Sequence, residues 1–83
     1  SDLEARVKAD PADLQARFDL AGAFAASGRF DQAADQLLAI VAADRDWNDQ
    51  AARKQLLTVF DAAGTNSDVA RNGRRKLSSI LFA

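Results

Sequence analysis

The feature that most constrains this chain is an internal repeat with an offset of 36 residues. Residues 16–28 align without a gap on residues 52–64, and six positions are identical: Ala16/Ala52, Arg17/Arg53, Leu20/Leu56, Phe24/Phe60, Ala26/Ala62 and Gly28/Gly64. Each segment is typical of a helix that ends at a glycine and is followed by a second helix. One such hairpin cannot bury its own apolar face, so the repeat predicts hairpins stacked side by side.

The spacing of apolar residues predicts helices throughout the chain. From Phe30 to Val41 they recur at i, i+3, i+4, i+7, i+8 and i+11, which places them on one helical face. No segment alternates apolar and polar residues for long, so strands are not expected. The expected helices span residues 2–9, 12–27, 30–43, 47–63 and 67–82. Short connections then indicate an all-α fold in which five antiparallel helices form one domain, residues 1–83.

Capping residues set the expected helix boundaries. Asp10 is expected to cap the second helix, and Pro11 suits its first turn because that position needs no N–H donor. Gly28 and Gly64 are expected to end the helices before them, since glycine enters the left-handed backbone conformation without strain. The last two helices are expected to start at the polar runs 46–49 and 65–68.

The period and the residue pattern resemble the tetratricopeptide repeat, a helical hairpin of about 34 residues. The resemblance is good over residues 14–43, where the characteristic positions hold Leu20, Ala21, Phe24, Gly28, Ala33, Leu37 and Ile40. Arg17 replaces the usual tryptophan, and the closing proline is replaced near Arg45. The second repeat matches only in its first helix, because Gly73 stands where a large apolar residue is expected.

Several short segments follow one another in a specific order. They are DP at 10–11, GRFDQA at 28–33, RDWND at 45–49, ARKQLL at 52–57 and RRKLSSILF at 74–82. This order resembles the C-terminal repeat domain of YbbN-type bacterial thioredoxin-fold co-chaperones. The resemblance implies a fragment of a longer cytoplasmic protein, with a thioredoxin-like domain expected upstream and absent here. It also implies a protein-binding role toward the chaperonin, the Hsp70 system or unfolding clients.

The composition argues against chemistry within this domain. The chain has neither His nor Cys, which excludes the usual zinc sites, thiol nucleophiles and imidazole bases. We therefore expect no enzyme, no cofactor and no metal site. Residues 44–49 faintly resemble a calcium loop, but Asp49 replaces its turn glycine and Gln55 its bidentate glutamate, so helix capping explains them better. No apolar run reaches the length of about 18 residues that spans a membrane.

One candidate protein-binding surface lies on the first helices of the two repeats. Arg17 and Arg53 occupy equivalent positions and either bind an acidic partner or pair with carboxylates on neighbouring helices. We favour the structural alternative, because charged helix residues usually form a solvated face. Phe18 is expected in the same groove, whose other residues are small: Gly22, Ala25 and Ala26. Such a groove is shallow and apolar and suits a hydrophobic segment.

The second candidate surface is the last helix, which carries the densest basic cluster of the chain. We expect a protein partner to dock on Arg74, Arg75, Leu77, Ile80, Leu81 and Phe82. An equally favoured alternative is that Leu77 and Leu81 only cap the end of the stack. Nucleic acid is not expected, because no aromatic residues interleave the cluster, and the apolar stripe is too short for a membrane surface.

The charges are unevenly divided along the chain. Residues 1–50 hold ten acidic and five basic side chains, whereas residues 51–83 hold two acidic and six basic ones. The basic rear of one copy can therefore meet the acidic front of another. This leaves self-association as an alternative function, namely a scaffold or oligomerisation segment whose assembly is sensitive to salt.

Overall fold

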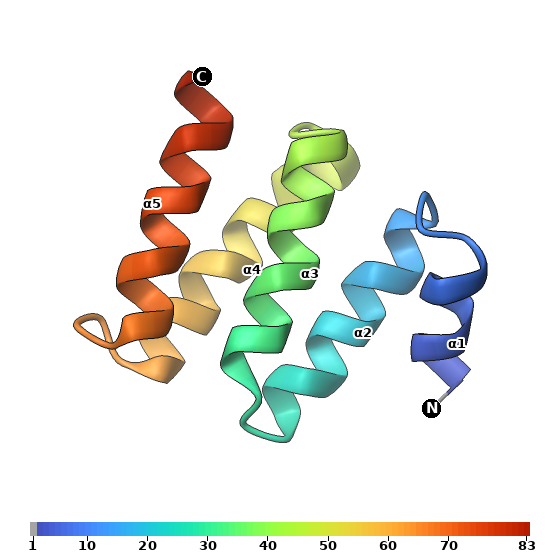
Figure 1. Ribbon diagram of the computed structural model, residues 1–83, viewed down its shortest axis with the longest axis horizontal. Coiled ribbons are helices and arrows are strands. Elements are labelled where there is room, and N and C mark those ends of the chain that lie inside the picture. Colours follow the sequence, from blue (N-terminus) through green and yellow to red (C-terminus); the bar gives the residue numbers. More distant parts are fainter. Residues whose placement is uncertain (1) are drawn as a thin grey trace.

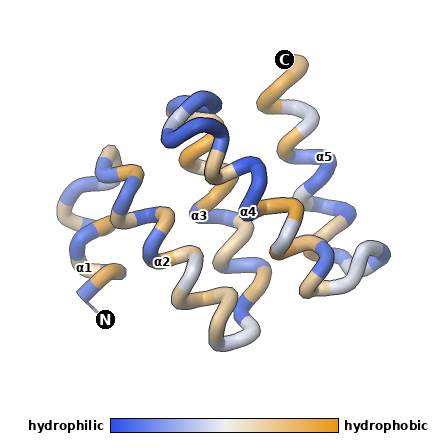
Figure 2. The backbone as a smooth tube through the Cα atoms, turned by 180° about the vertical axis from the view of Figure 1, so that it is seen from behind, coloured by the Kyte–Doolittle hydropathy of each residue, from blue (hydrophilic) through white to orange (hydrophobic). Residues whose placement is uncertain are grey.

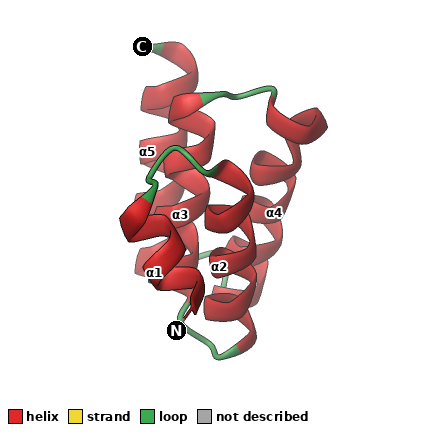
Figure 3. Ribbon diagram, turned by 90° about the vertical axis from the view of Figure 1, so that its right-hand side faces the viewer, coloured by secondary structure: helices red, strands yellow, loops and turns green. Residues whose placement is uncertain are grey.

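The computed structural model describes residues 2–83; Ser1, which belongs to the predicted domain, lies outside them. The described residues form five helices: α1 (Asp2–Ala9), α2 (Leu14–Ala26), α3 (Phe30–Ala43), α4 (Trp47–Ala63) and α5 (Asp68–Phe82). Successive helices run in opposite directions (Figure 1), and only loops join them (Figure 3). The predicted all-α stack of five antiparallel helices is confirmed.

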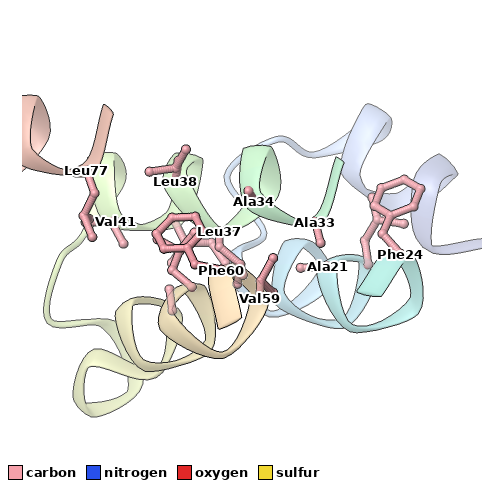
Figure 4. Close-up of a cluster of buried hydrophobic side chains, with 14 of the residues drawn as sticks. Ala21, Phe24, Ala33, Ala34, Leu37, Leu38, Val41, Val59, Phe60 and Leu77 are labelled. Carbon is pink, nitrogen blue, oxygen red and sulfur yellow. The ribbon is translucent and has the colours of Figure 1, made fainter. Parts of the chain in front are cut away.

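Helix α3 occupies the centre of the stack and contacts α2, α4 and α5. Its buried stripe recurs every three or four residues, and Ala33, Leu37 and Ile40 are completely inaccessible to solvent. Leu37 lies against Val59 and Phe60 of α4 (Figure 4), so this one side chain joins the two hairpins. The apolar face that each hairpin leaves open is therefore buried by its neighbour.

The two helices of the first hairpin approach each other through alanines. Ala21 of α2 and Ala33 of α3 face each other (Figure 4) and are both almost fully buried. Gly28 then reverses the chain with a φ of +78°, and the Arg29 N–H donates to the Phe24 carbonyl oxygen at 2.8 Å. The predicted glycine turn is confirmed here, and again at Gly64, where φ is +105°.

The start of α2 differs from the prediction. Asp13, not Asp10, is the capping residue: its carboxylate accepts a hydrogen bond from the Ala16 N–H at 3.0 Å. Asp10 instead accepts from the Ala12 N–H at 3.2 Å and closes a turn around Pro11. Helix α2 therefore begins at Leu14, two residues later than predicted.

The start of α4 also differs from the prediction. Asp46 stands at its N-terminus but makes no side-chain capping bond. Asn48, Asp49 and Gln50 follow with φ values of +48°, +57° and +63°, so they form a left-handed turn before the regular helix. This turn lies between Trp47, whose ring contacts Phe18 at a centroid distance of 5.4 Å, and the buried Ala52.

Gly73 explains how α5 packs on α4. A side-chain carbon at this position would overlap the ring of Phe60, so the ring fills the space beneath the glycine. The large apolar residue expected at position 73 is thus replaced by one from the neighbouring helix. The close approach buries Ala70 and Leu77 of α5 in the same core.

Candidate functional site

A cleft opens at the end of the stack where α3 ends, α4 begins and α5 ends. Its volume is about 160 Å³, and it is lined by Val41, Arg45, Asp46, Gln50, Arg53, Leu81 and Phe82. In Figure 1 the last turns of α5 and the connection between α3 and α4 both lie toward the upper end of the molecule. The cleft is the place where the predicted site residues converge most closely.

The lining of the cleft combines apolar side chains with two arginines and the carboxylate of Asp46. Val41 is buried, Leu81 packs against the core, and Phe82 is 82% exposed. Within residues 2–83, no ion pair joins the guanidinium groups of Arg45 and Arg53 to a carboxylate. The cleft can therefore accept an apolar side chain beside a carboxylate, and no nucleophile stands next to a base among its lining residues.

This cleft unites residues that the sequence placed on separate surfaces. Arg53 was expected in the inner groove, whereas Leu81 and Phe82 were expected on the last helix. Residues from the start of α4 and from the end of α5 line the same cleft, which brings Arg53 together with these two side chains. The repeat pattern points to Arg53 and the apolar end of the last helix to Leu81 and Phe82, but only the packing of α5 places the three residues around one cleft.

The other residues of the predicted docking surface divide between core and surface. Leu77 is only 7% exposed and packs in the core, which agrees with the capping alternative. Ile80 is half-buried against that core. Arg74 and Arg75 are exposed, and the Arg75 guanidinium donates to the Asn72 side-chain oxygen at 3.3 Å. Figure 2 shows the same division, since α5 changes from a hydrophilic middle to a hydrophobic end.

Arg17 and Phe18 are engaged within the chain. The Arg17 guanidinium donates to the Pro11 carbonyl oxygen at 2.8 Å and to the Gln36 side-chain oxygen at 2.9 Å. These acceptors are neutral, unlike the carboxylate that the structural alternative predicted. Phe18 is half-buried and its ring contacts Trp47. Both contacts tie α2 to its neighbours, so these two residues are left out of the cleft.

Leu57 is an exposed apolar residue that sequence reasoning missed. It is 51% exposed, although its repeat equivalent Ala21 is 1% exposed. Val59 of α4 is buried in the core, whereas its repeat equivalent in α2, Ala23, is exposed. The two helices therefore bury different faces, and Leu57 lies outside the buried face of α4. The repeat alone predicts the same burial at both positions, so no sequence signal marks Leu57.

Two further classes of site are not found in the described part of the chain. None of its helices is both long and apolar enough to cross a bilayer. Its acidic side chains also form no cluster of three or more that is suited to hold a metal ion.

Comparison with known proteins identifies the family of the chain. The sequence model of the tetratricopeptide repeat family matches residues 1–82. No curated protein and no solved structure matches the chain. The match spans both hairpins and α1, and it agrees with the stacked antiparallel helices and the glycine turns described above. The chain therefore belongs to the tetratricopeptide repeat family.

Proposed function

We propose that this domain is a non-catalytic protein-interaction module of a thioredoxin-fold co-chaperone in the bacterial cytoplasm. Tetratricopeptide repeats mediate contacts between proteins, which supports the interaction role. The order of short segments that resembles YbbN-type proteins supports the co-chaperone context. In this proposal the domain contacts the chaperonin, the Hsp70 system or an unfolding client through the cleft at the end of the stack.

The observation that carries the proposal is Phe82 beside Arg53 and Arg45 at that cleft. Phe82 leaves 82% of its surface in water, and burying such a side chain contributes about 1.5–3 kcal/mol. The two arginines have no carboxylate partner within the described chain, so a partner's acidic group can pair with them. Aromatic residues, including phenylalanine, and arginine are both enriched in protein interfaces.

Titration of the purified chaperonin and of purified Hsp70 onto the immobilised domain tests this proposal. Phe82→Ala is expected to weaken binding by roughly tenfold or more, because a loss of about 1.4 kcal/mol corresponds to tenfold. Arg53→Glu is expected to weaken it as well, and more strongly at low salt. Leu57→Ala serves as the matched control, since Leu57 is exposed and apolar but does not line the cleft.

Two results would contradict the proposal. One is an affinity of the Phe82→Ala variant equal to that of the wild type. The other is a wild-type domain that binds neither chaperone and does not slow the aggregation of an unfolding client protein. Circular dichroism of each variant checks that the helices remain intact.

A further inference from the structure

A second hollow lies on the opposite side of α5, between α5 and α3. Its volume is about 340 Å³, and it is lined by Asp31, Ala34, Asp35, Leu38, Asp68, Val69, Asn72, Gly73 and Lys76. Its floor is apolar, because Ala34 and Leu38 are buried and Gly73 adds no side chain. Helices α3 and α5 run in the same direction (Figure 1), so the hollow extends along both of them.

The hollow carries negative charge that the described chain does not neutralise. Asp31 and Asp35 are exposed, one helical turn apart on α3, and no described residue forms an ion pair with either. Like charges at this spacing destabilise a helix by a few tenths of a kcal/mol. Asp68 is already paired with Arg71 at 2.7 Å, and Lys76 lies about two turns further along α5. An incoming cation is therefore favoured at the end that holds Asp31 and Asp35.

The opposite charge gathers on another face of the same helix. Arg74 and Arg75 are exposed and do not line the hollow. Within residues 2–83 neither Arg74 nor Arg75 is paired with a carboxylate, whereas Arg71 pairs with Asp68 at the hollow. Arg74 and Arg75 are thus complementary in charge to Asp31 and Asp35, and within one molecule no ion pair joins the two groups.

We infer that the hollow beside Asp31 and Asp35 in one copy receives the Arg74 and Arg75 face of α5 from a second copy. Each contact pairs cations with carboxylates and relieves like-charge repulsion on both surfaces. The apolar floor at Leu38 then buries the aliphatic stems of the arginines. This inference does not rest on the chaperone contact proposed above, because it uses different residues.

Sedimentation equilibrium of the 83-residue chain tests this inference with a charge-swap pair. The wild type is expected to self-associate at about 0.01 M salt, where the screening length is about 30 Å, and to dissociate at about 1 M salt, where the screening length is about 3 Å. The variants Asp31→Lys/Asp35→Lys and Arg74→Glu/Arg75→Glu are each expected to associate at least about tenfold more weakly, a change of about 1.4 kcal/mol. An equimolar mixture of the two variants is expected to associate again, because their patches are once more opposite in sign.

The control separates local contacts from net charge. Asp19→Lys/Asp61→Lys changes the total charge by the same amount as Asp31→Lys/Asp35→Lys, at two exposed carboxylates outside the hollow, and it is expected to associate like the wild type. A wild type that stays monomeric at low salt overturns the inference. So does a mixture of the two swapped variants that associates no better than either alone, provided that circular dichroism shows both folded.

Discussion

At the scale of single residues, two helical glycines occupy opposite environments. Gly73 lies in α5 directly over the ring of Phe60, where any side-chain carbon would overlap that ring. Gly22 lies in α2 with no atom within 4 Å of the position that a side-chain carbon would occupy. The first glycine allows two helices to touch, whereas the second only lowers the stability of its own helix.

We therefore expect the same substitution to act in opposite directions at these positions. Gly73→Ala is expected to lower the free energy of unfolding by up to about 2 kcal/mol, because the overpacking cost of about 1–3 kcal/mol outweighs the gain in helix propensity of about 1 kcal/mol. Gly22→Ala is expected to raise it by up to about 1 kcal/mol. Urea unfolding of both variants measures the difference. A stabilised Gly73→Ala variant would show that α5 does not approach Phe60 closely.

At the scale of helices, α4 has an unusual beginning. Asn48, Asp49 and Gln50 turn left-handed, although none of them is glycine. Asparagine and aspartate tolerate this conformation, but for other residues it costs about 1–2 kcal/mol each. Gln50 therefore carries most of the strain, and it also lines the cleft beside Arg53. The turn thus places stored strain next to the proposed binding site.

A pair of glutamine substitutions tests this strain. Gln50→Gly is expected to raise the free energy of unfolding by up to about 1 kcal/mol, since glycine adopts a positive φ without steric cost. Gln55→Gly, in the regular part of α4, is expected to lower it by up to about 1 kcal/mol. Thermal unfolding of the two variants compares one residue change in two backbone conformations. Equal destabilisation at both positions would mean that position 50 is right-handed in solution.

The boundaries of a helix could be predicted from the sequence where the spacing of apolar residues and a flanking glycine indicated the same boundary. Helix α3 begins and ends at the predicted residues, because its apolar stripe is regular and Gly28 precedes it. The prediction was wrong at the start of α2, where Asp13 caps the helix and Asp10 closes a turn around Pro11 instead. It also missed the turn at Asn48, since its handedness depends on where tertiary packing holds the flanking residues.

At the scale of the whole molecule, the candidate site was only partly visible in the sequence. The sequence singled out Arg53 and Phe82 as candidate binding residues but did not show that they share a cleft, because it could not place the end of α5 relative to the start of α4. It also could not separate Leu77, which is buried, from Phe82, which is exposed. Both residues lie on α5, and their exposure differs because the neighbouring helices cover Leu77 but do not cover Phe82.

The position of α3 determines how the whole molecule is expected to unfold. It contacts α2, α4 and α5, so residues 2–83 share one core, and neither hairpin keeps its apolar face covered without the other. Repeat proteins with such interfaces lose cooperativity only when the interface energy is small. Here fully buried side chains form the interface, with Leu37 of α3 against Val59 of α4. The two hairpins should therefore unfold together in a single transition.

Trp47 allows the joint unfolding of the two hairpins to be measured, because it is the only tryptophan and its ring contacts Phe18 of the other hairpin. Its fluorescence reports the contact between α2 and α4, while circular dichroism reports all the helices. In urea both signals are expected to change with the same midpoint and slope. Leu37→Ala, which opens a cavity at the interface and costs about 2–5 kcal/mol, is expected to lower both midpoints together. A fluorescence change that comes well before the loss of helicity would instead mean that the hairpins separate before they unfold, and that their stacking contributes little to stability.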